Sequence, residues 1–279
     1  AAELLRLVQR ERVSQLSIVG DAFARPIVEE LKRAELSGQP HDLSSLSRIV
    51  STGATLSSEM KSALMERATQ AVVMDMIGAS EGGPFAVAMT MPGQDPVATA
   101  AFMATPNTSL FDPQTWEKIP FGSGRNGVLA AAGAMPDGYF GDAEKTAQTF
   151  RVIEGVRYTI PGDFAEIDED GTVHLLGRGS VCINTGGEKV YPEEVEVAAR
   201  SHPNVVDCVV VGLPDTRFGE IITLVAERSG EISETEVIEH VKKLLATYKA
   251  PRRVIFVDQV YRSPSGKADY RWAKEIASA

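Results

Sequence analysis

The residues best suited to chemistry lie in the segment from Met76 to Gly83, at the end of a strand-like apolar run. Its small residues, Gly78 and Ala79 among them, allow backbone amides to approach a phosphate. Ser80 and Glu81 offer two oxygens that suit a hard cation such as Mg²⁺. A tight glycine turn with Glu81 in solvent explains the same residues, so this candidate loop depends on support from other motifs.

Two further segments combine glycine with polar groups. Ser51-Thr-Gly53-Ala54-Thr55 lies between an apolar run and a capped helix, where either a ligand site or a plain strand-to-helix connection fits. Gly162-Asp163 places a carboxylate after a glycine turn, and Gly177-Arg178 follows the next hairpin. Aspartate can accept both hydroxyls of a ribose, and arginine can bind phosphate or hold that carboxylate. The alternative is a purely structural ion pair between Asp163 and Arg178.

A third glycine pattern, Gly122-Ser-Gly124-Arg-Asn-Gly127, has the spacing of a dinucleotide-binding loop. Such a loop must lead into a helix whose N-terminus faces the pyrophosphate. Here an apolar, strand-like run from Val128 to Ala132 follows instead. We therefore interpret this pattern as a glycine-rich turn.

The most informative stretch is Gly177 to Glu196, GRGSVCINTGGEKVYPEEVE. It closely resembles the signature that opens the C-terminal domain of the adenylate-forming superfamily, which comprises acyl-CoA synthetases, peptide-synthetase adenylation domains and luciferases. The sequences of this stretch and of Ile18 to Arg25 are most similar to those of bacterial fatty-acyl and sterol-side-chain acyl-CoA synthetases. Four more segments resemble family motifs in the family's order: Gly53-Ala54-Thr55 the adenine-side segment, Gly78-Ala79-Ser80-Glu81 the G-x-T-E motif, Gly162-Asp163 the ribose motif, and Pro264-Ser-Gly266-Lys267 the motif with the catalytic lysine.

The resemblance implies a two-step reaction with ATP, Mg²⁺, CoA and a small carboxylic acid, either a fatty acid or a sterol side-chain acid. Lys267 would stabilise the adenylation step, and Ser80 and Glu81 would hold Mg²⁺. The nucleotide would bind along Gly53, Ala54, Thr55, Ile77, Gly78, Ala79, Asp163 and Arg178. CoA would pass Gly186, Gly187 and Glu188 after the small domain rotates near Arg178 to Ser180. The alternatives are a non-catalytic nucleotide- or partner-binding protein, and acyl transfer to a carrier protein.

Three departures from the family pattern qualify this expectation. The family's Ser/Thr/Gly-rich phosphate loop with its lysine is not found in this sequence. The first residues, with Leu4, Leu5 and Val8 on one helical face and no cap before them, predict a chain that starts inside a helix downstream of that loop. We therefore expect a fragment of a longer protein, with a processed N-terminus as the alternative, and we expect this portion alone to be inactive. Ile77 stands where an aromatic residue usually stacks on adenine, so we expect that stacking to be weaker or to come from another residue. Val181 replaces the usual aspartate of G-R-x-x-D, and Ser180 replaces the hinge Asp or Lys.

The elements that must position these residues fall into three parts. Strand-like runs near Ser17 to Gly20, Arg48 to Ser51 and Ala71 to Ile77 alternate with helices at Phe23 to Leu36 and Ser57 to Arg67, which predicts a parallel sheet up to about residue 95. From Pro96 to Leu176, short runs and turns, including Asp137-Gly138 and Asp170-Gly171, predict antiparallel hairpins. The expected fold is α/β plus a β-rich subdomain over residues 1–176, with a smaller C-terminal α+β domain over 177–279.

Within that last domain, Pro192 opens a Glu-rich helix and Val205 to Gly212 is a strand. A capping box of Ser233 and Glu236 starts a helix that we expect to continue until shortly before Pro251. A strand at Val254 to Val257 ends the predicted elements. The apolar stripe expected on that second helix consists of Val237, Val241, Leu244, Leu245 and Tyr248.

The composition fits a globular protein and excludes several classes. Hydrophobic residues make up 43%, and 28 basic against 38 acidic residues give a net charge of −10, which disfavours nucleic acid and anionic membranes as partners. No apolar run reaches the roughly 18 residues of a membrane span. Cys182 and Cys208 lack disulfide or zinc spacing, so we expect free thiols and a cytoplasmic location. Oligomeric state, a homo-oligomer included, is left open.

Overall fold

The computed structural model describes residues 1–94 and 102–279, which divide into two units. Unit 1 comprises Ala1–Pro161, Ala165–His174 and Ser265–Lys267; unit 2 comprises Gly162–Phe164, Leu175–Pro264 and Ala268–Ala279. The domain boundary expected at residue 177 stays a prediction, and the change of texture expected at Pro96 lies outside the described residues. No helix in the described part of the chain is long and apolar enough to cross a membrane.

Unit 1 begins with alternating helices and strands and continues as a run of short strands. Its elements are α1 (Ala2–Arg10), β1 (Gln15–Ile18), α2 (Gly20–Leu36), β2 (Arg48–Thr52), α3 (Ser58–Met65), β3 (Val72–Ala79), β4 (Gly82–Thr90), β5 (Phe102–Ala104), β6 (Thr108–Phe111), β7 (Gly127–Ala132), α4 (Ala143–Thr149), β8 (Phe150–Ile153), β9 (Val156–Thr159), and parts of β10 (Asp163–Ile167) and β11 (Thr172–Arg178).

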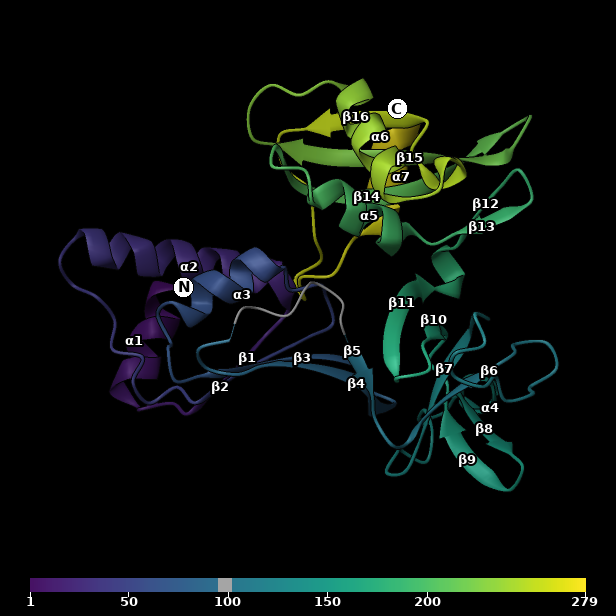
Figure 1. The fold of residues 1–279 in the computed structure, drawn as a ribbon, viewed down its shortest axis with the longest axis horizontal. Helices are drawn as coiled ribbons and strands as arrows, with labels where there is room; N and C mark the ends of the chain where they lie inside the picture. Colours follow the sequence, from purple (N-terminus) through teal and green to yellow (C-terminus); the bar gives the residue numbers. More distant parts are fainter. Residues whose placement is uncertain (95–101) are drawn as a thin grey trace. The chain divides into compact units, whose positions relative to one another are not determined.

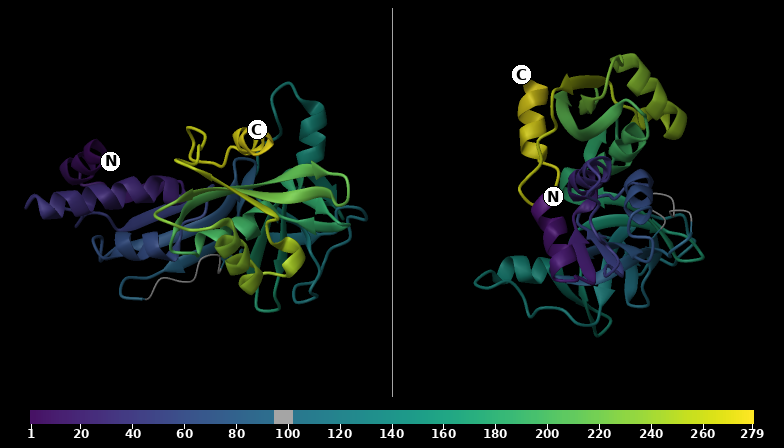
Figure 2. Two further views of the ribbon diagram at one scale, coloured as in Figure 1. Left: turned by 90° about the horizontal axis from the view of Figure 1, so that it is seen from above. Right: turned by 90° about the vertical axis from the view of Figure 1, so that its left-hand side faces the viewer.

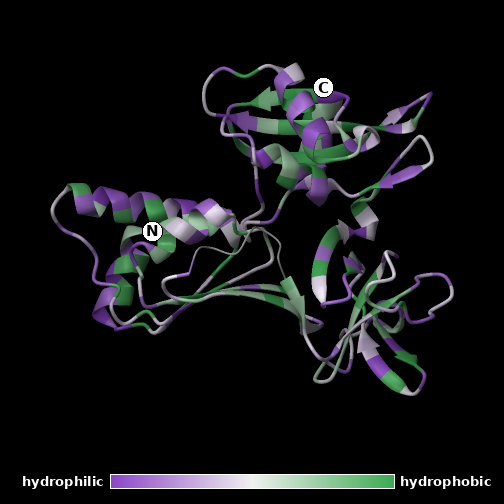
Figure 3. Ribbon diagram, viewed as in Figure 1, coloured by the Kyte–Doolittle hydropathy of each residue, from purple (hydrophilic) through white to green (hydrophobic). Residues whose placement is uncertain are grey.

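The predicted parallel sheet is present: β1, β2 and β3 pair in parallel, with Leu16 opposite Ile49 and Ile49 opposite Val73. These three side chains are buried in one core with the apolar faces of α1, α2 and α3. Figure 1 shows α2 and α3 together over the three strands, and the mixed colours along α2 in Figure 3 show its polar and apolar sides. Burial of the apolar side on the strands is what holds such a helix in place.

From β4 onward the pairing of unit 1 becomes antiparallel. The turn-rich sequence predicts this pairing for the strands after residue 96, whereas β4 lies in the part expected to be parallel, and that expectation is wrong for β4. The sheet runs in the order β1-β2-β3-β4-β5-β11-β10-β7-β9-β8, and β6 pairs with β7. The hairpin expected at Asp170-Gly171 joins β10 to β11. The hairpin expected at Asp137-Gly138 is wrong: those residues lie in a loop before α4, whose first turn is capped by Asp142. That cap makes a helix where the sequence was expected to give strands only.

Unit 2 is a mixed sheet with helices on both faces. Its elements are η1 (Gly179–Val181), β12 (Ile183–Thr185), β13 (Glu188–Val190), α5 (Pro192–Arg200), β14 (Val205–Asp215), β15 (Gly219–Arg228), α6 (Glu234–Leu244), η2 (Thr247–Lys249), β16 (Arg253–Val257) and α7 (Tyr270–Ser278).

Alternation along β14 builds the two faces of this sheet. Cys208 and Val210 face the core under α5 and α6, whereas Val209 and Val211 face α7. The right-hand view of Figure 2 shows the yellow α7 on one side of the sheet and the yellow-green α6 on the other. Because successive strand residues point to opposite faces, one strand supplies both cores.

The helix started by Ser233 is shorter than expected. The capping box is present, but α6 ends at Leu244, and a separate 3₁₀ turn covers Thr247–Lys249. Leu244 and Tyr248 are exposed, so only Val237 and Val241 of the predicted stripe are buried in the helix. Leu245 adopts extended geometry as the C-cap, which ends the helical periodicity at that residue.

Candidate active site

The first group of candidate residues lies where β2 and β3 end. Thr52 pairs with Met76, and the Thr52 hydroxyl donates a hydrogen bond to the Met76 carbonyl at 3.0 Å. Gly53 and Ile77 therefore follow at neighbouring positions at the carboxyl ends of parallel strands, where ligands of such sheets bind. Gly53 has φ +84°, a left-handed conformation that favours glycine. Ile77 is buried.

Lys267 lies against Gly53 within unit 1. A Cβ placed on Gly53 would be 3.5 Å from Lys267 Cε and 3.8 Å from Val19 Cγ1. The neighbouring Gly266 packs on the start of α2, with a Cβ there 3.2 Å from side-chain atoms of both Val19 and Phe23. Gly53 and Lys267, far apart in the sequence, are thus brought together.

Ala54 and Thr55 rest on the start of α2, and sequence reasoning missed the residue that permits this. A Cβ on Gly20 would lie 2.4 Å from the Thr55 carbonyl oxygen, and Gly20 has φ +50°. The Asp21 amide donates to that same oxygen at 3.0 Å, and the Asp21 carboxylate accepts from the Ser57 amide at 2.7 Å. Gly20 follows a strand as Gly53 does, and this position was the signal that could have identified it.

A buried ion pair supports this edge from behind. Lys61 Nζ lies 3.2 Å from Asp75 Oδ2, and the two side chains are only 1% and 5% exposed. Burial raises the pKa of Asp75, while Lys61 and the Ser51 hydroxyl oppose that rise. Ser51 Oγ also accepts from the Gly20 amide at 3.3 Å. The pair therefore connects the interior of the sheet to the turn before α2.

The loop that we expect to bind phosphate and magnesium, around Gly78 to Gly83, is a turn of only two residues. Gly78 and Ala79 belong to β3, and Ala79 pairs with Gly82 of β4, so Ser80 and Glu81 alone form the turn of a tight hairpin. Glu81 is not a solvent residue, because its carboxylate accepts a hydrogen bond from the Tyr139 hydroxyl. Tyr139 comes from the loop before α4, and no sequence spacing indicated this contact.

The donor set of this hairpin fits a magnesium ion that also binds phosphate. Mg²⁺ in such sites takes one or two protein oxygens and completes its shell with phosphates and water. Ser80 and Glu81 supply that number, and Ser80 is exposed. Among the described residues, no group of three or more His, Cys, Asp or Glu side chains is placed to hold a metal by itself.

The Asp163 and Arg178 pair forms within unit 2. Arg178 Nε lies 3.1 Å from Asp163 Oδ1, with the aspartate side chain 15% exposed and the arginine 54% exposed. The Gly179 amide donates to the Gly162 carbonyl at 3.1 Å, and a Cβ on Gly179 would lie 2.7 Å from the Phe164 ring. Both glycines therefore serve to hold the ends of β10 and β11 together with the ion pair between them.

The glycines proposed to face CoA have a local structural reason. Gly186 and Gly187, at φ +60° and +89°, form the two-residue turn between β12 and β13, where Thr185 pairs with Glu188. Positive φ at both central positions is typical of a tight hairpin turn and favours glycine. Glu188 is exposed beside the turn. The turn leaves an open backbone surface, but the geometry alone does not require a ligand.

The two cysteines have no geometry for nucleophilic chemistry. Both are free thiols, and burial raises the pKa of each, most strongly for the fully buried Cys208. A thiol with a raised pKa is a poor nucleophile at neutral pH.

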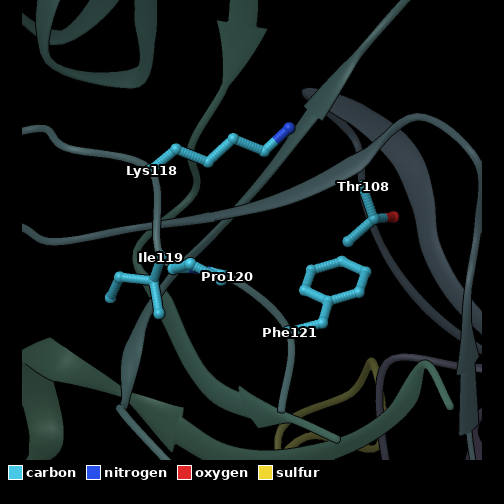
Figure 4. Close-up of a pocket in the computed structure, with 5 residues that line it drawn as sticks. All are labelled: Thr108, Lys118, Ile119, Pro120 and Phe121. Atoms are coloured by element: carbon cyan, nitrogen blue, oxygen red, sulfur yellow. The ribbon is translucent and has the colours of Figure 1, made fainter. Parts of the chain in front are cut away.

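One open cavity of about 390 Å³ lies apart from the candidate residues, in the β-rich part of unit 1. Figure 4 shows the ring of Phe121 beside Thr108. None of the residues expected to bind nucleotide or CoA lines it; its lining is Thr108, Lys118, Ile119, Pro120 and Phe121.

Comparison with known families and relatives places these residues in context. Residues 194–267 match the family described as AMP-binding enzyme C-terminal domain. The chain is 46% identical over its whole length to the medium/long-chain-fatty-acid--CoA/3-oxocholest-4-en-26-oate--CoA ligase of Mycobacterium tuberculosis strain H37Rv, covering 50% of that protein. It is 42% identical to the 3-oxocholest-4-en-26-oate--CoA ligase of Rhodococcus rhodochrous, over 98% of the chain and 50% of that protein. The chain thus spans about half the length of the curated relatives it matches.

Solved structures agree with the fold. ATP-bound MatB from Rhodopseudomonas palustris matches with a TM-score of 0.76 and 28% identity, over 99% of this chain and 52% of that one. The amide bond synthetase McbA from Marinactinospora thermotolerans matches with a TM-score of 0.81 and 26% identity, over 99% of this chain and 55% of that one. The expected fold class, an α/β and β-rich part with a smaller α+β part, is confirmed as a truncated form of the fold of these enzymes.

Proposed function

The chain belongs to the adenylate-forming superfamily, and from this premise we propose that the protein containing it activates a carboxylic acid with ATP and transfers the acyl group to CoA. The observation that supports this most directly is the position of Lys267 against Gly53, at the carboxyl end of β2. This contact brings the expected catalytic cation to the expected adenine-side segment.

In the first step, a carboxylate oxygen of the acid attacks the α-phosphorus of ATP, and pyrophosphate leaves. Charge repulsion between two anions is the main barrier. Lys267 lowers it by holding both the carboxylate and the α-phosphate, and its flexible stem allows it to follow the reacting atoms. Magnesium, when bound at Ser80 and Glu81, neutralises phosphate charge.

Binding residues fix the nucleotide for this in-line attack. Asp163 accepts the ribose hydroxyls while Arg178 holds its carboxylate in place, and the pairing distance of 3.1 Å supports that division of roles. The adenine side is formed by the backbone of the Gly53 turn and by the small residues of the β3 end, in place of an aromatic ring. The full set on that side is Gly53, Ala54, Thr55, Ile77, Gly78 and Ala79.

In the second step the CoA thiol, as thiolate, attacks the acyl carbonyl of the adenylate, a thioester bond forms and AMP leaves with the bonding electrons. Gly186 and Gly187 give the pantetheine arm a surface without side chains, with Glu188 at its side. Transfer to a carrier-protein pantetheine uses the same chemistry, and free CoA is favoured because the two relatives described above are named CoA ligases.

The substrate is proposed to be a fatty acid or a sterol side-chain acid. The names of the relatives support this class, since they act on medium- and long-chain fatty acids and on 3-oxocholest-4-en-26-oate. A cytoplasmic location, expected from the two thiols, stays a prediction, and the oligomeric state stays open.

Mass spectrometry of reaction products tests the proposal. The full-length protein and this 279-residue chain are each incubated with ATP, Mg²⁺, CoA and a pool of fatty and steroid carboxylic acids. We expect acyl-CoA from the full-length protein and none from this chain. Failure of the full-length protein to form either acyl-adenylate or acyl-CoA, with ATP still bound, would favour the non-catalytic binding protein.

A further inference from the structure

Glu193 is half-buried, its Oε2 atom is fully buried, and the proposed reaction does not use its carboxyl group. It is the second residue of α5, and its carboxyl faces the end of β11. A Cβ on Gly177 would lie 1.9 Å from Glu193 Oε2, and Gly177 has φ +123°. The carboxyl therefore occupies the space that a side chain at position 177 would need, directly before Arg178.

Two segments of unit 2 meet at this carboxyl. The Arg178 backbone amide and the Tyr270 hydroxyl both face it and favour its charged form. Glu196, one turn along α5, faces it with the same charge and disfavours that form, although Arg200 lies 3.7 Å from Glu196. Glu193 Oε2 is buried and finds no hydrogen-bond partner within the described residues. The charged carboxylate is therefore incompletely satisfied in its pocket.

Both segments lead to residues of the proposed site. On one side, Arg178 pairs with Asp163. On the other, Tyr270 begins α7, three residues after Lys267. The loop before Tyr270 is closed by a bridge between Arg262 and Ala268, and the Arg262 guanidinium binds Asp207 through two contacts of 2.6 Å. Glu193 is thus the group that both segments share.

We propose that Glu193 is a positioning residue whose carboxyl joins the Gly177–Arg178 backbone to the Tyr270 end of the loop that carries Lys267. The roles of Arg178 and Lys267 in this inference rest on the proposed function. The joining of the two segments rests on the contacts of Glu193 alone.

The direction of the pH effect follows from burial. Burial, reinforced by Glu196, raises the pKa of Glu193 to about 7. In an open state, where water reaches the carboxyl, its pKa returns to the ordinary value near 4.5. Because the folded-state pKa is the higher one, the contribution of this group to local stability is complete below about pH 4.5 and is lost as the pH rises through about 7.

Hydrogen exchange in the full-length protein tests the inference. We compare wild type with Glu193→Gln, which keeps the shape and removes the charge, at matched pH values so that intrinsic exchange cancels. For amides of residues 177–179 and 268–270, the ratio of wild-type to variant exchange should rise about tenfold between about pH 6 and about pH 8. Glu239→Gln, which removes an exposed carboxylate on α6, should behave as wild type.

A second variant guards against a folding defect in the first. Tyr270→Phe removes a hydroxyl that favours the charged form, so the rise in exchange of residues 177–179 should move to higher pH. Amides of residues 268–270, which lose their contact with Glu193 in this variant, should exchange faster than in wild type already at about pH 6. Exchange ratios that do not change with pH, or an unshifted rise in Tyr270→Phe, would overturn the inference. Adenylation is assayed on the same samples: no adenylate from wild type, with the exchange difference intact, would overturn the proposed function and leave this inference standing.

Discussion

The carboxyl edge of β1–β3 and the interior of unit 2 hold their important residues by different means. At the edge, backbone hydrogen bonds and left-handed glycines set the positions, as in the contact between the Asp21 amide and the Thr55 carbonyl. In unit 2, partly buried charged side chains do so, as in the Arg262 and Asp207 pair, whose side chains are 20% and 21% exposed. Added side-chain volume should therefore destabilise the edge, where backbone contacts fix the positions. Unit 2, where charged side chains fix the positions, should instead respond to removal of a charge and to pH.

The largest effect is expected for Lys267 at the carboxyl edge of β1–β3, because its ammonium group supplies a positive charge that the backbone there does not. Lys267→Ala in the full-length protein should reduce adenylation about a thousandfold, since a cation on the reacting phosphate is lost. Thioester formation from supplied acyl-adenylate should persist, because that step needs CoA attack and not the α-phosphate contact. Stopped assays of each half-reaction measure this, with the exposed Lys274→Ala as control. Equal loss in both half-reactions would contradict separate roles for the two steps.

Lys61 is an exception to this comparison, because it forms a buried ion pair with Asp75 beneath the carboxyl edge of β1–β3, where the other positions are set by backbone contacts. Lys61→Met should lower the free energy of unfolding by about 3–5 kcal/mol, because Asp75 would be left buried without its partner. Adding Asp75→Leu should restore much of that loss. Urea unfolding measures both variants, with Lys242→Met in an exposed pair costing under about 1 kcal/mol. A Lys61→Met cost equal to that of the exposed pair would show that the buried ion pair does not hold the edge.

Gly20 tests whether the carboxyl edge of β1–β3 is sensitive to added side-chain volume. Gly20 and Gly38 both have positive φ, but a Cβ meets the Thr55 carbonyl at 2.4 Å in the first case and nothing within 4 Å in the second. Alanine at either position carries the cost of the left-handed conformation, about 1 kcal/mol. Gly20→Ala should cost about 2 kcal/mol more than Gly38→Ala in thermal unfolding, because the turn must also move. Equal losses of stability in Gly20→Ala and Gly38→Ala would mean that the turn at Thr55 moves without cost to make room for the added methyl group.

The same contrast explains what could be predicted from the sequence. Periodicity and glycine after a strand predicted β1, β2, β3 and the Gly53 turn, because these features depend on residues close together in the chain. The resemblance, and not spacing, pointed to Lys267, whose contact with Gly53 joins distant segments. Nothing local indicated that Tyr139 would bind Glu81 or that Glu193 would fill the space beside Gly177, since such contacts exist only after packing.

Two elements differ from their prediction for reasons of local capping and packing: the hairpin expected at Asp137-Gly138 and the length of α6. The segment around Asp137 carries turn residues, but Asp142 caps the seven-residue helix α4, which directly precedes β8. Leu244 continues the apolar periodicity of α6, yet the chain turns extended at Leu245 and leaves Leu244 exposed. Turn and periodicity signals show where an element can form, and tertiary packing decides where it ends.

The smallest effect on stability is expected at the Arg178 and Asp163 pair, and there the site and the scaffold can be separated. Arg178→Lys keeps the charge but loses the planar fork, and the arginine is half exposed, so the free energy of unfolding should change by less than about 1 kcal/mol. The KM for ATP should nevertheless rise about tenfold if this pair holds the ribose. Arg125→Lys is a matched control, because Arg125 pairs with Asp112 at the same 3.1 Å and with similar exposure. Equal KM values in the two variants would reduce the Arg178 pair to a structural contact, since stability alone cannot distinguish two ion pairs of the same geometry.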